Sequence, residues 1–279
     1  YTTTLPASYP KGYNAFYCMK YEISQGQYSA FLNTLDAASQ FAFYPNEFND
    51  TRNRVSGGGT PPDLYYSDRP DRAHNFMSWR DLLAYLDWAA LRPMTELQYE
   101  KATRGFGPYV EGEFAWGSTA GTPLTTIATP EDGTELSLTV GANCRYNVNA
   151  ITGGDGGAGP VRVGIFATGT TTTRQQTGAS FFGIMEMSGN LWEQCVAVRT
   201  EAPVLAYDGR WGDGYIDAAN GVANVTNWPY QDCPSGTCYR TPRGGYYASG
   251  AADVRTADRS FYYYGTNSRQ RDYGGRGIR

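Results

Sequence analysis

The chain has 279 residues, of which 18% are charged, and its formal net charge is −4. The length allows one large domain or two small ones, and 34 Gly with 15 Pro indicate a loop-rich globular protein. No run of 18 apolar residues is present, which excludes a membrane span in this chain, and the acidic balance argues against nucleic-acid binding.

The first quarter of the sequence predicts a strand, a helix and a loop. Residues 13–23 alternate in part and are rich in aromatic side chains, which predicts a strand that ends at Ile23. Ser24 then has the position of an N-cap, and the apolar spacing predicts a helix to about Leu35. Residues 44–73 are rich in Pro, Gly, Asp and Asn, so we expect a long irregular loop there.

Two more helices are predicted before residue 106. Ser78 is placed to cap a helix that buries Leu82 and Leu86 and ends at 92–93. Thr95 and Gln98 have the spacing of a capping box for a short helix over 95–103. From residue 106 onward the pattern indicates short strands and Gly-containing turns without a helix, so the predicted class is α+β.

The reactive side chains are few. The five cysteines are Cys18, Cys144, Cys195, Cys233 and Cys238. Only the last two are close in sequence, in DCPSGTC, where a local disulfide and two free thiols are both compatible with the turn residues. The single histidine, His74, excludes a His-rich metal site or a catalytic His pair. We expect it to be an ordinary surface or loop residue.

The segment 243–279 has an unusual composition. It contains seven Arg, seven Gly and six Tyr, but no Lys or Glu. Disordered tails contain few aromatics, whereas Tyr, Ser, Gly, Asn and Arg are typical of paratopes, where Tyr gives rigid contact area at low entropic cost. The segment therefore predicts a binding surface on a scaffold, and an irregular terminal strand pair with a polar edge is the alternative.

Four segments of the chain resemble, in order, motifs of the formylglycine-generating enzyme (sulfatase-modifying factor) family. They are YEISQGQYSAFLN, NFMSWRDLLAYLDWAALRPMTELQYEKATRG, FFGIMEMSGNLWEQ, and TPRGGYYASGAADVRTADRS with the final GIR. The resemblance covers nearly the whole chain. It implies a single C-type lectin-like domain over residues 1–279, with few helices around a twisted, irregular antiparallel sheet.

The resemblance also implies calcium as a structural cofactor. At the first family site the ligands would be the side chains of Glu186 and Glu193 and the main-chain carbonyls of Gly189 and Leu191. Such an oxygen set suits Ca²⁺. Glu186 departs from the Asp or Asn usual in the family, and a metal-free turn with Trp192 in the core is the alternative.

A second family calcium site maps onto a glycine-rich loop. Its ligands would be Asn143, the carbonyl of Cys144, Asp155 and the carbonyl of Gly157. The loop between them differs from the family pattern, and a solvent loop without metal is the alternative.

Both known chemistries of the family lack their metal ligands here. The family's oxidase uses a cysteine pair just after the GG of the last motif to bind copper and activate oxygen. Here Tyr246 to Ala251 follow Gly244 and Gly245, and no cysteine occurs after Cys238. The related sulfoxide synthases need iron bound by several histidines, and only His74 is present. Because Ser or Ala cannot replace a thiolate, we expect neither copper nor enzymatic activity.

The C-terminal segment also resembles the variable region of proteins diversified by retroelements, which use the C-type lectin fold. Arg243, Gly245, Val254, Arg255, Ala257, Arg259 and Ile278 would hold the backbone. The displayed set would be Tyr247, Ser249, Ala251, Asp253, Asp258, Ser260, Tyr262, Tyr263, Tyr264, Thr266, Ser268 and Asp272. In those proteins this set binds the ligand, and Tyr is a common hot-spot residue.

The sequence therefore predicts a non-catalytic protein that binds a protein or cell-surface ligand. A viral adhesin at the virion surface and an extracellular or cell-surface receptor both fit, as does a place in a larger viral or surface assembly. A formylglycine-generating-type enzyme with altered chemistry and a calcium-dependent carbohydrate-binding module are the alternatives.

Overall fold

The computed structural model describes residues 4–45, 51–217, 221–229, 233, 238–261 and 267–279. Three helices begin where the sequence predicts them: α1 (Gln25–Asn33), α3 (Trp79–Trp88) and α4 (Glu96–Arg104). Each starts with a capping box, in which Ser24, Ser78 or Thr95 exchanges hydrogen bonds with the residue three positions on. The predicted helix starts are confirmed, and α2 (Ala37–Phe43) follows α1 after a short break.

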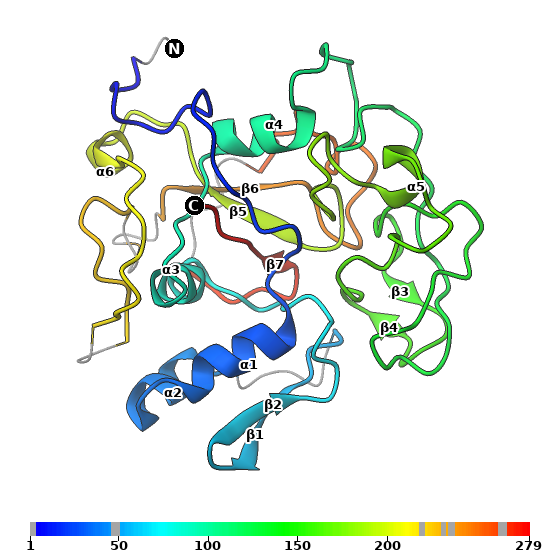
Figure 1. The fold of residues 1–279 in the computed structure, drawn as a ribbon, viewed down its shortest axis with the longest axis horizontal. Helices are drawn as coiled ribbons and strands as arrows, with labels where there is room; N and C mark the ends of the chain where they lie inside the picture. The colour runs from blue at the N-terminus through cyan, green and yellow to red at the C-terminus, as the bar shows by residue number, and fades with distance from the viewer. Residues whose placement is uncertain (1–3, 46–50, 218–220, 230–232, 234–237, 262–266) are drawn as a thin grey trace.

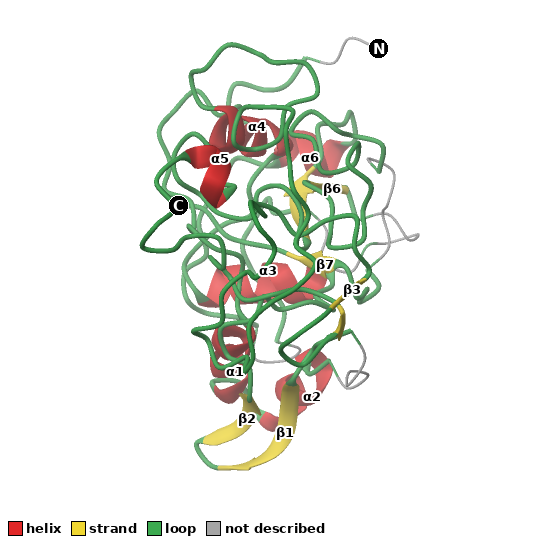
Figure 2. Cartoon of the chain, turned by 90° about the vertical axis from the view of Figure 1, so that its right-hand side faces the viewer, coloured by secondary structure: helices red, strands yellow, loops and turns green. Residues whose placement is uncertain are grey.

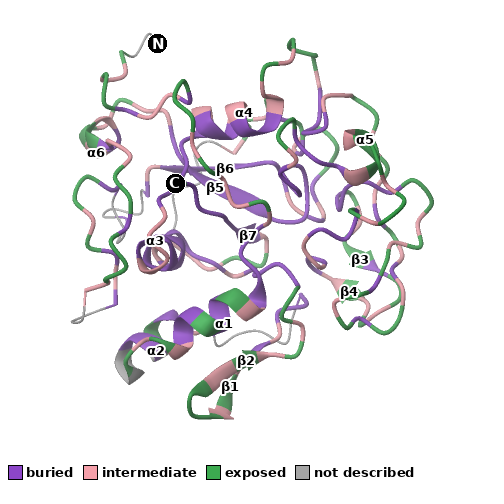
Figure 3. Cartoon of the chain, viewed as in Figure 1, coloured by how far each residue is buried: buried purple, intermediate pink, exposed green. Residues whose placement is uncertain are grey.

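A three-stranded sheet forms the centre of the molecule (Figure 1). Its middle strand is β5 (Trp192–Val196), with β6 (Arg240–Arg243) antiparallel on one side and β7 (Tyr273–Gly274) parallel on the other. Every residue of the three strands is buried (Figure 3). The N-cap of α4 touches the same sheet through a bridge between Thr95 and Val196.

Residues 275–279 lie against residues 17–23. The Met19 N–H donates to the Gly277 carbonyl at 3.0 Å, and the Arg279 N–H donates to the Tyr17 carbonyl at 2.8 Å. The predicted strand over 13–23 is wrong as a regular element, because it contains one isolated bridge, at Cys18, and the next bridge follows it at Ser24.

A hairpin replaces the predicted irregular loop of residues 44–73. Strand β1 (Val55–Thr60) pairs antiparallel with β2 (Asp63–Ser67) at one end of the molecule (Figures 1 and 2). Local propensity conceals these strands, since β1 contains three consecutive glycines. A contact from α1 fixes them instead: the Asn33 side chain both accepts from and donates to the Tyr65 backbone at 2.8 Å.

The segment 117–178, here called the outer lobe, carries β3 (Ala150–Ile151), β4 (Gly157–Ala158) and α5 (Arg174–Thr177) at one side of the molecule (Figure 1). A further short helix, α6 (Ala202–Ala206), lies on the opposite side. The prediction of no helix after residue 106 is therefore wrong at α5 and α6.

The loop-rich α+β class is confirmed. The C-type lectin-like assignment and the single domain over 1–279 stay predictions. Across the described ranges, no helix is both long and apolar enough to cross a bilayer.

Candidate functional site

The turn that leads into β5 is held by a buried carboxylate from the N-terminal segment. Asn190, at φ +63°, accepts the Val161 N–H at 2.9 Å through its side-chain oxygen. Its side-chain nitrogen donates to one oxygen of Glu22 at 2.5 Å, and the Leu191 N–H donates to the other at 3.0 Å. Glu22 thus fixes the Gly-Asn turn from a position that the sequence analysis did not assign to any site.

Three buried carboxyl groups gather beside one buried guanidinium. Glu22, Glu186 and Glu193 are all at most 5% exposed, and Arg276 is fully buried. Arg276 donates to Glu193 Oε1 at 2.5 Å. Burial raises the pKa of all three carboxyls, to about 7 for Glu186, and for Glu22 the charge of Glu193 raises it further.

Two of these three carboxyl groups, Glu186 and Glu193, are ligands of the first predicted calcium site. Glu186 Oε1 accepts the Gly164 N–H at 2.9 Å, but Glu186 Oε2 and Glu193 Oε2 are buried without a hydrogen-bond partner. Unpartnered buried oxygens are costly, and a bound cation would satisfy them. Within the described residues, however, no group of three or more His, Cys, Asp or Glu side chains is arranged to hold a metal. Calcium at this turn stays a prediction.

The second predicted calcium site does not fit. The Asn143 side chain accepts the Thr122 N–H at 2.9 Å and donates to the Gln175 carbonyl at 2.6 Å. Both oxygens of Asp155 are engaged by guanidinium groups, with Arg69 at 2.7 Å and Arg72 at 2.8 Å. The Cys144 carbonyl accepts the Leu124 N–H, and Gly157 pairs with Ile151 in the β3–β4 ladder. The expected ligands serve other contacts.

Predicted framework residues of the C-terminal segment do hold it to the core. Arg243 is 1% exposed and donates to Glu96 at 3.1 Å, to Glu100 at 2.6 Å and to the Thr256 carbonyl at 2.7 Å. Arg259 reaches the same carboxylate, Glu96, with contacts of 2.7 and 2.8 Å. One buried carboxylate therefore anchors both arginines.

Gly245 explains how the segment turns. At its φ of +72°, a Cβ would lie 2.3 Å from Val254 Cγ1, so only glycine fits this close approach. Val254 and Ile278 are buried as expected of framework residues. Arg255 and Ala257 are exposed, so they belong to the outside of the segment rather than to its packing.

The prediction that Tyr247 and Ser249 face a partner is wrong. Tyr247 is fully buried, because its N–H donates to the Asn190 carbonyl at 2.9 Å and its ring lies 5.4 Å below the Arg145 guanidinium. Ser249 is 4% exposed, and its hydroxyl accepts the Tyr246 N–H at 3.0 Å within a tight turn. Both residues hold the turn that follows Gly245.

The other predicted display positions are more open. Ala251 and Ser260 are exposed, Asp253, Asp258, Ser268 and Asp272 are half-buried, and Tyr262, Tyr263, Tyr264 and Thr266 lie outside the described residues. Phe261 and Tyr246 are half-buried against the ring of Trp192, with centroids 5.0 and 6.2 Å away. Trp192 itself is 3% exposed, which confirms it as a core residue.

The thiols offer no reactive group at this segment. Cys233 and Cys238 form a disulfide, as their spacing allows. Cys18, Cys144 and Cys195 are free, and burial raises the pKa of each, to about 12 for Cys18. These three therefore stay protonated near neutral pH, where thiolate chemistry needs a lowered pKa.

His74 lies in a loop, one of the two predicted alternatives, but it is not at the surface. It is 1% exposed, and its ring stacks on Tyr28 with centroids 3.9 Å apart. Neither ring nitrogen has a hydrogen-bond partner among the described residues. Burial, with a smaller contribution from the positive charge of Arg269, lowers the His74 pKa to about 3. The imidazole is a neutral core side chain.

Residues 5–279 match the family described as the sulfatase-modifying factor enzyme 1-like domain. The chain belongs to this family. It is also similar to a formylglycine-generating enzyme from Thermomonospora curvata, with 26% identity over 185 residues. That alignment covers 64% of this chain and 51% of the relative, so the chain spans about half the length of the curated relative it matches.

Two residues of this buried cluster, Glu22 and Arg276, were not identified as site residues from the sequence. Glu22 lies two residues before the predicted cap Ser24, and an acidic residue between apolar Tyr21 and Ile23 is the signal that marks it. Arg276 lies between glycines in GGRGIR, whose small residues allow close packing around a guanidinium. The family motif directed attention to the final GIR, but the Arg that the core buries is Arg276, while Arg279 is exposed.

Proposed function

We propose that this chain is a non-catalytic member of its family that binds a ligand through its C-terminal segment. The observation that carries the proposal is the turn after Gly245. Just after the GG, where the oxidase of the family has its cysteine pair, this chain has Tyr246 to Ala251 without a cysteine, and Tyr247 and Ser249 of this turn are tied into the core. Of the free thiols elsewhere, Cys144 and Cys195 are buried and Cys18 is half-buried, and burial raises the pKa of all three, so none of them is a ready thiolate for copper.

The binding region is the C-terminal surface, defined as the exposed and half-buried residues of 246–261. Its small exposed side chains include Ala251 and Ser260, and the half-buried rings of Tyr246 and Phe261 flank them. Arg243 and Arg259 fix its backbone onto Glu96. A surface held in this way loses little freedom on binding, which favours affinity. The partner is a protein or a cell-surface molecule.

The composition of this surface supports a finer proposal, that the segment is varied by a retroelement. Buried positions such as Arg243, Gly245 and Val254 would stay constant, and exposed positions such as Ala251 and Ser260 would vary. The neighbouring genomic DNA tests it: a reverse transcriptase beside a near-copy of the coding segment, differing only at adenines, is expected. Such a protein would act at a virion or cell surface.

Turnover measurements test the absence of catalysis. The chain is loaded with Cu(I) and incubated in air with a cysteine-containing peptide, and the peptide is followed by mass spectrometry for formylglycine. No product is expected, because no cysteine follows Cys238. The formylglycine-generating enzyme of Thermomonospora curvata serves as the positive control. Copper-dependent product from this chain would establish the alternative, an enzyme with altered chemistry.

Binding measurements test the surface itself. A panel of purified cell-surface proteins is screened by biolayer interferometry against the wild-type chain and an Ala251→Arg/Ser260→Arg variant. The matched control is Ala7→Arg/Ser8→Arg, since both pairs are exposed Ala and Ser. We expect a partner that the first variant loses and the control keeps. A partner equally bound by both variants would place the binding elsewhere.

We also propose that calcium stabilises the turn before β5. The unpartnered Glu186 Oε2 and Glu193 Oε2 support this, and Glu186, Glu193 and the carbonyls of Gly189 and Leu191 would hold the ion. Bound calcium would neutralise the carboxylates and brace the turn. The Tm is expected to rise in millimolar CaCl2 relative to EDTA, and Glu186→Gln should abolish that rise. An identical Tm in both buffers would contradict the proposal.

A further inference from the structure

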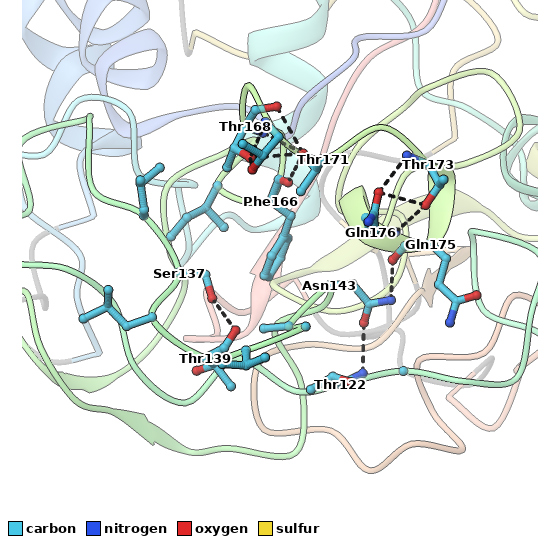
Figure 4. A pocket seen from close by; sticks show the side chains of 18 of the residues that line it. Thr122, Ser137, Thr139, Asn143, Phe166, Thr168, Thr171, Thr173, Gln175 and Gln176 are labelled. Atoms are coloured by element: carbon cyan, nitrogen blue, oxygen red, sulfur yellow. Dashed lines mark hydrogen bonds between the residues drawn. The ribbon is translucent and has the colours of Figure 1, made fainter.

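The outer lobe contains a cavity of about 1220 Å³ whose lining is entirely uncharged. Three segments form it: 119–122, 136–143 and 165–176 (Figure 4). None of the lining side chains is acidic or basic, although 18% of the chain is charged. A ligand that enters this cavity meets hydroxyl, amide and aliphatic groups only.

One side of the cavity is apolar. Leu136, Leu138 and Val140 are 49%, 60% and 95% exposed and line the cavity. Leu136 and Leu138 flank the bridge at Ser137, and the Leu138 N–H donates to the Thr126 carbonyl at 2.9 Å. Residues two apart in an extended chain share one face, so these two leucines lie side by side, and Val140 follows in the turn over 139–142.

Another part of the lining carries hydroxyl and amide groups. The Gln176 Oε1 accepts the N–H groups of Thr172 and Thr173 at 2.9 and 3.1 Å, which fixes the carboxamide. Gln175 and Gln176 are exposed residues, and the Nε2 of neither donates to another described residue. In Figure 4, Phe166 lies between the segment of Ser137 and Thr139 and the loop of Thr168 and Thr171.

Buried Asn143 holds these parts together. Its side chain donates to the Gln175 carbonyl at 2.6 Å and accepts the Thr122 N–H at 2.9 Å (Figure 4). Asn143 thereby joins the start of the lining to the helix that carries the two glutamines. The amide donors are thus presented by a preformed wall, as in most small-molecule sites.

We propose that this cavity binds a neutral oligosaccharide. A sugar has an apolar C–H face for the aliphatic side chains and hydroxyls for the amide and hydroxyl groups. A phosphorylated or acidic ligand would find no basic side chain to pair with among the lining residues. A peptide adding to the 136–140 segment would find the Leu138 N–H and the Leu136 carbonyl already bonded to residues 126 and 128.

This cavity is separate from the C-terminal surface, since none of its lining residues comes from 246–261. It is also independent of calcium, because the only predicted calcium ligand among its lining residues is Asn143, whose carboxamide is engaged. The inference therefore stands or falls apart from the proposed function.

An array of neutral and anionic oligosaccharides probed with the full chain in EDTA tests the inference, with Kd values then measured by calorimetry. Gln175→Glu/Gln176→Glu keeps the side-chain shape but removes both Nε2 donors. We expect at least about a tenfold rise in Kd for the neutral oligosaccharide bound by the wild type. Gln270→Glu, an exposed glutamine outside the cavity, is the matched control and should leave Kd unchanged.

A second variant covers the case in which the double variant disturbs α5. Thr122→Val keeps the shape of an exposed lining residue and removes its hydroxyl, and a several-fold rise in Kd is expected. Wild-type Kd in both variants, preference for anionic glycans, binding only to uncharged peptides, or no neutral oligosaccharide bound on the array would each overturn the inference.

Discussion

The central sheet and the cavity of the outer lobe use charge in opposite ways. The sheet and its surroundings bury Arg243, Arg276, Glu96 and Glu193 almost completely (Figure 3). The cavity is open to solvent, where charge costs little, yet none of its lining residues is charged. Charged side chains therefore occur where burial carries a large desolvation penalty, and they are absent from the cavity lining, where that penalty would be small.

Pairing explains the first half of this contrast. Two of the buried cations near the sheet have carboxylates at hydrogen-bond distance: Arg243 has Glu96 and Glu100, and Arg276 has Glu193. Arg240 of β6 instead lies over the Tyr273 ring, 4.2 Å from its centroid. A guanidinium suits this role because its planar fork makes several directed bonds. Of the 23 basic residues only Lys11, Lys20 and Lys101 are lysines, so the bias toward Arg in the sequence is a signature of this interior. For the uncharged cavity, the neutral ligand proposed above would account for the second half of the contrast.

Breaking a buried pair should have the largest effect. Arg276→Met leaves Glu193 buried without its cation, so the free energy of unfolding should fall by about 3–5 kcal/mol. Urea denaturation measures it. In the double variant Arg276→Met/Glu193→Gln much of the loss should be recovered, and an Arg276→Met chain as stable as wild type would contradict the role of the pair.

The next largest loss of stability is expected at Trp192, in β5 of the same sheet. Trp192→Ala removes a ring that packs on Phe261 and Tyr246, and we expect a loss of about 3 kcal/mol. Trp192→Phe is the conservative control and should lose less. Unchanged thermal stability of the Ala variant would refute the placement of Trp192 in the core.

His74 differs from the buried Arg and Glu side chains near the sheet, because it is an ionisable group that burial keeps neutral. Its pKa is about 3 when folded, while an unfolded histidine titrates near 6.5. Between these values the unfolded chain binds more protons, so stability is fully present above pH 6.5 and falls as the pH falls. From pH 6.5 to 5 this loss is about 2 kcal/mol.

The variant His74→Phe should lack this part of the pH dependence while keeping the stacking on Tyr28. Denaturation at pH 7 and pH 5 gives the slope for both chains, and the carboxyl groups they share cancel in the comparison. Equal slopes would mean that His74 is not buried in solution.

The smallest effect is expected at the cavity. Thr170→Asp places a charge on an exposed lining residue, so stability should change by less than about 0.5 kcal/mol. The matched change in the sheet, Thr241→Asp, buries a charge at a fully buried position and should destabilise the chain strongly. Similar stabilities for the two variants would remove the contrast between the regions.

Features that depend on contacts between residues close in the sequence could be predicted from the sequence. The caps at Ser24, Ser78 and Thr95 depend on residues three apart, and all three are confirmed. For Cys233 and Cys238, five apart, the sequence left a disulfide and free thiols open, and the structure has the disulfide. The family was accessible too, because four motifs occur in order and residues 5–279 match it.

Features that depend on contacts between residues far apart in the sequence could not be predicted from it. Tyr247 looks like a display residue by composition, but its backbone bond to Asn190 turns it inward. His74 has no local partner that would signal burial, and it is Tyr28 from α1 that covers it. The β1–β2 hairpin likewise depends on Asn33, more than 20 residues earlier in the chain.

The contact between residues 275–279 and residues 17–23 affects when the chain can complete its fold during translation. Met19 and Gly277 are 258 positions apart, so this contact has a high loop-closure cost and a high contact order. During synthesis, residues 17–23 leave the ribosome long before their partners exist, and the fully buried Ile278 cannot fill its place until translation has passed it. The nascent chain must therefore keep an unfinished core, and a chaperone that shields residues 17–23 would raise the yield of folded protein.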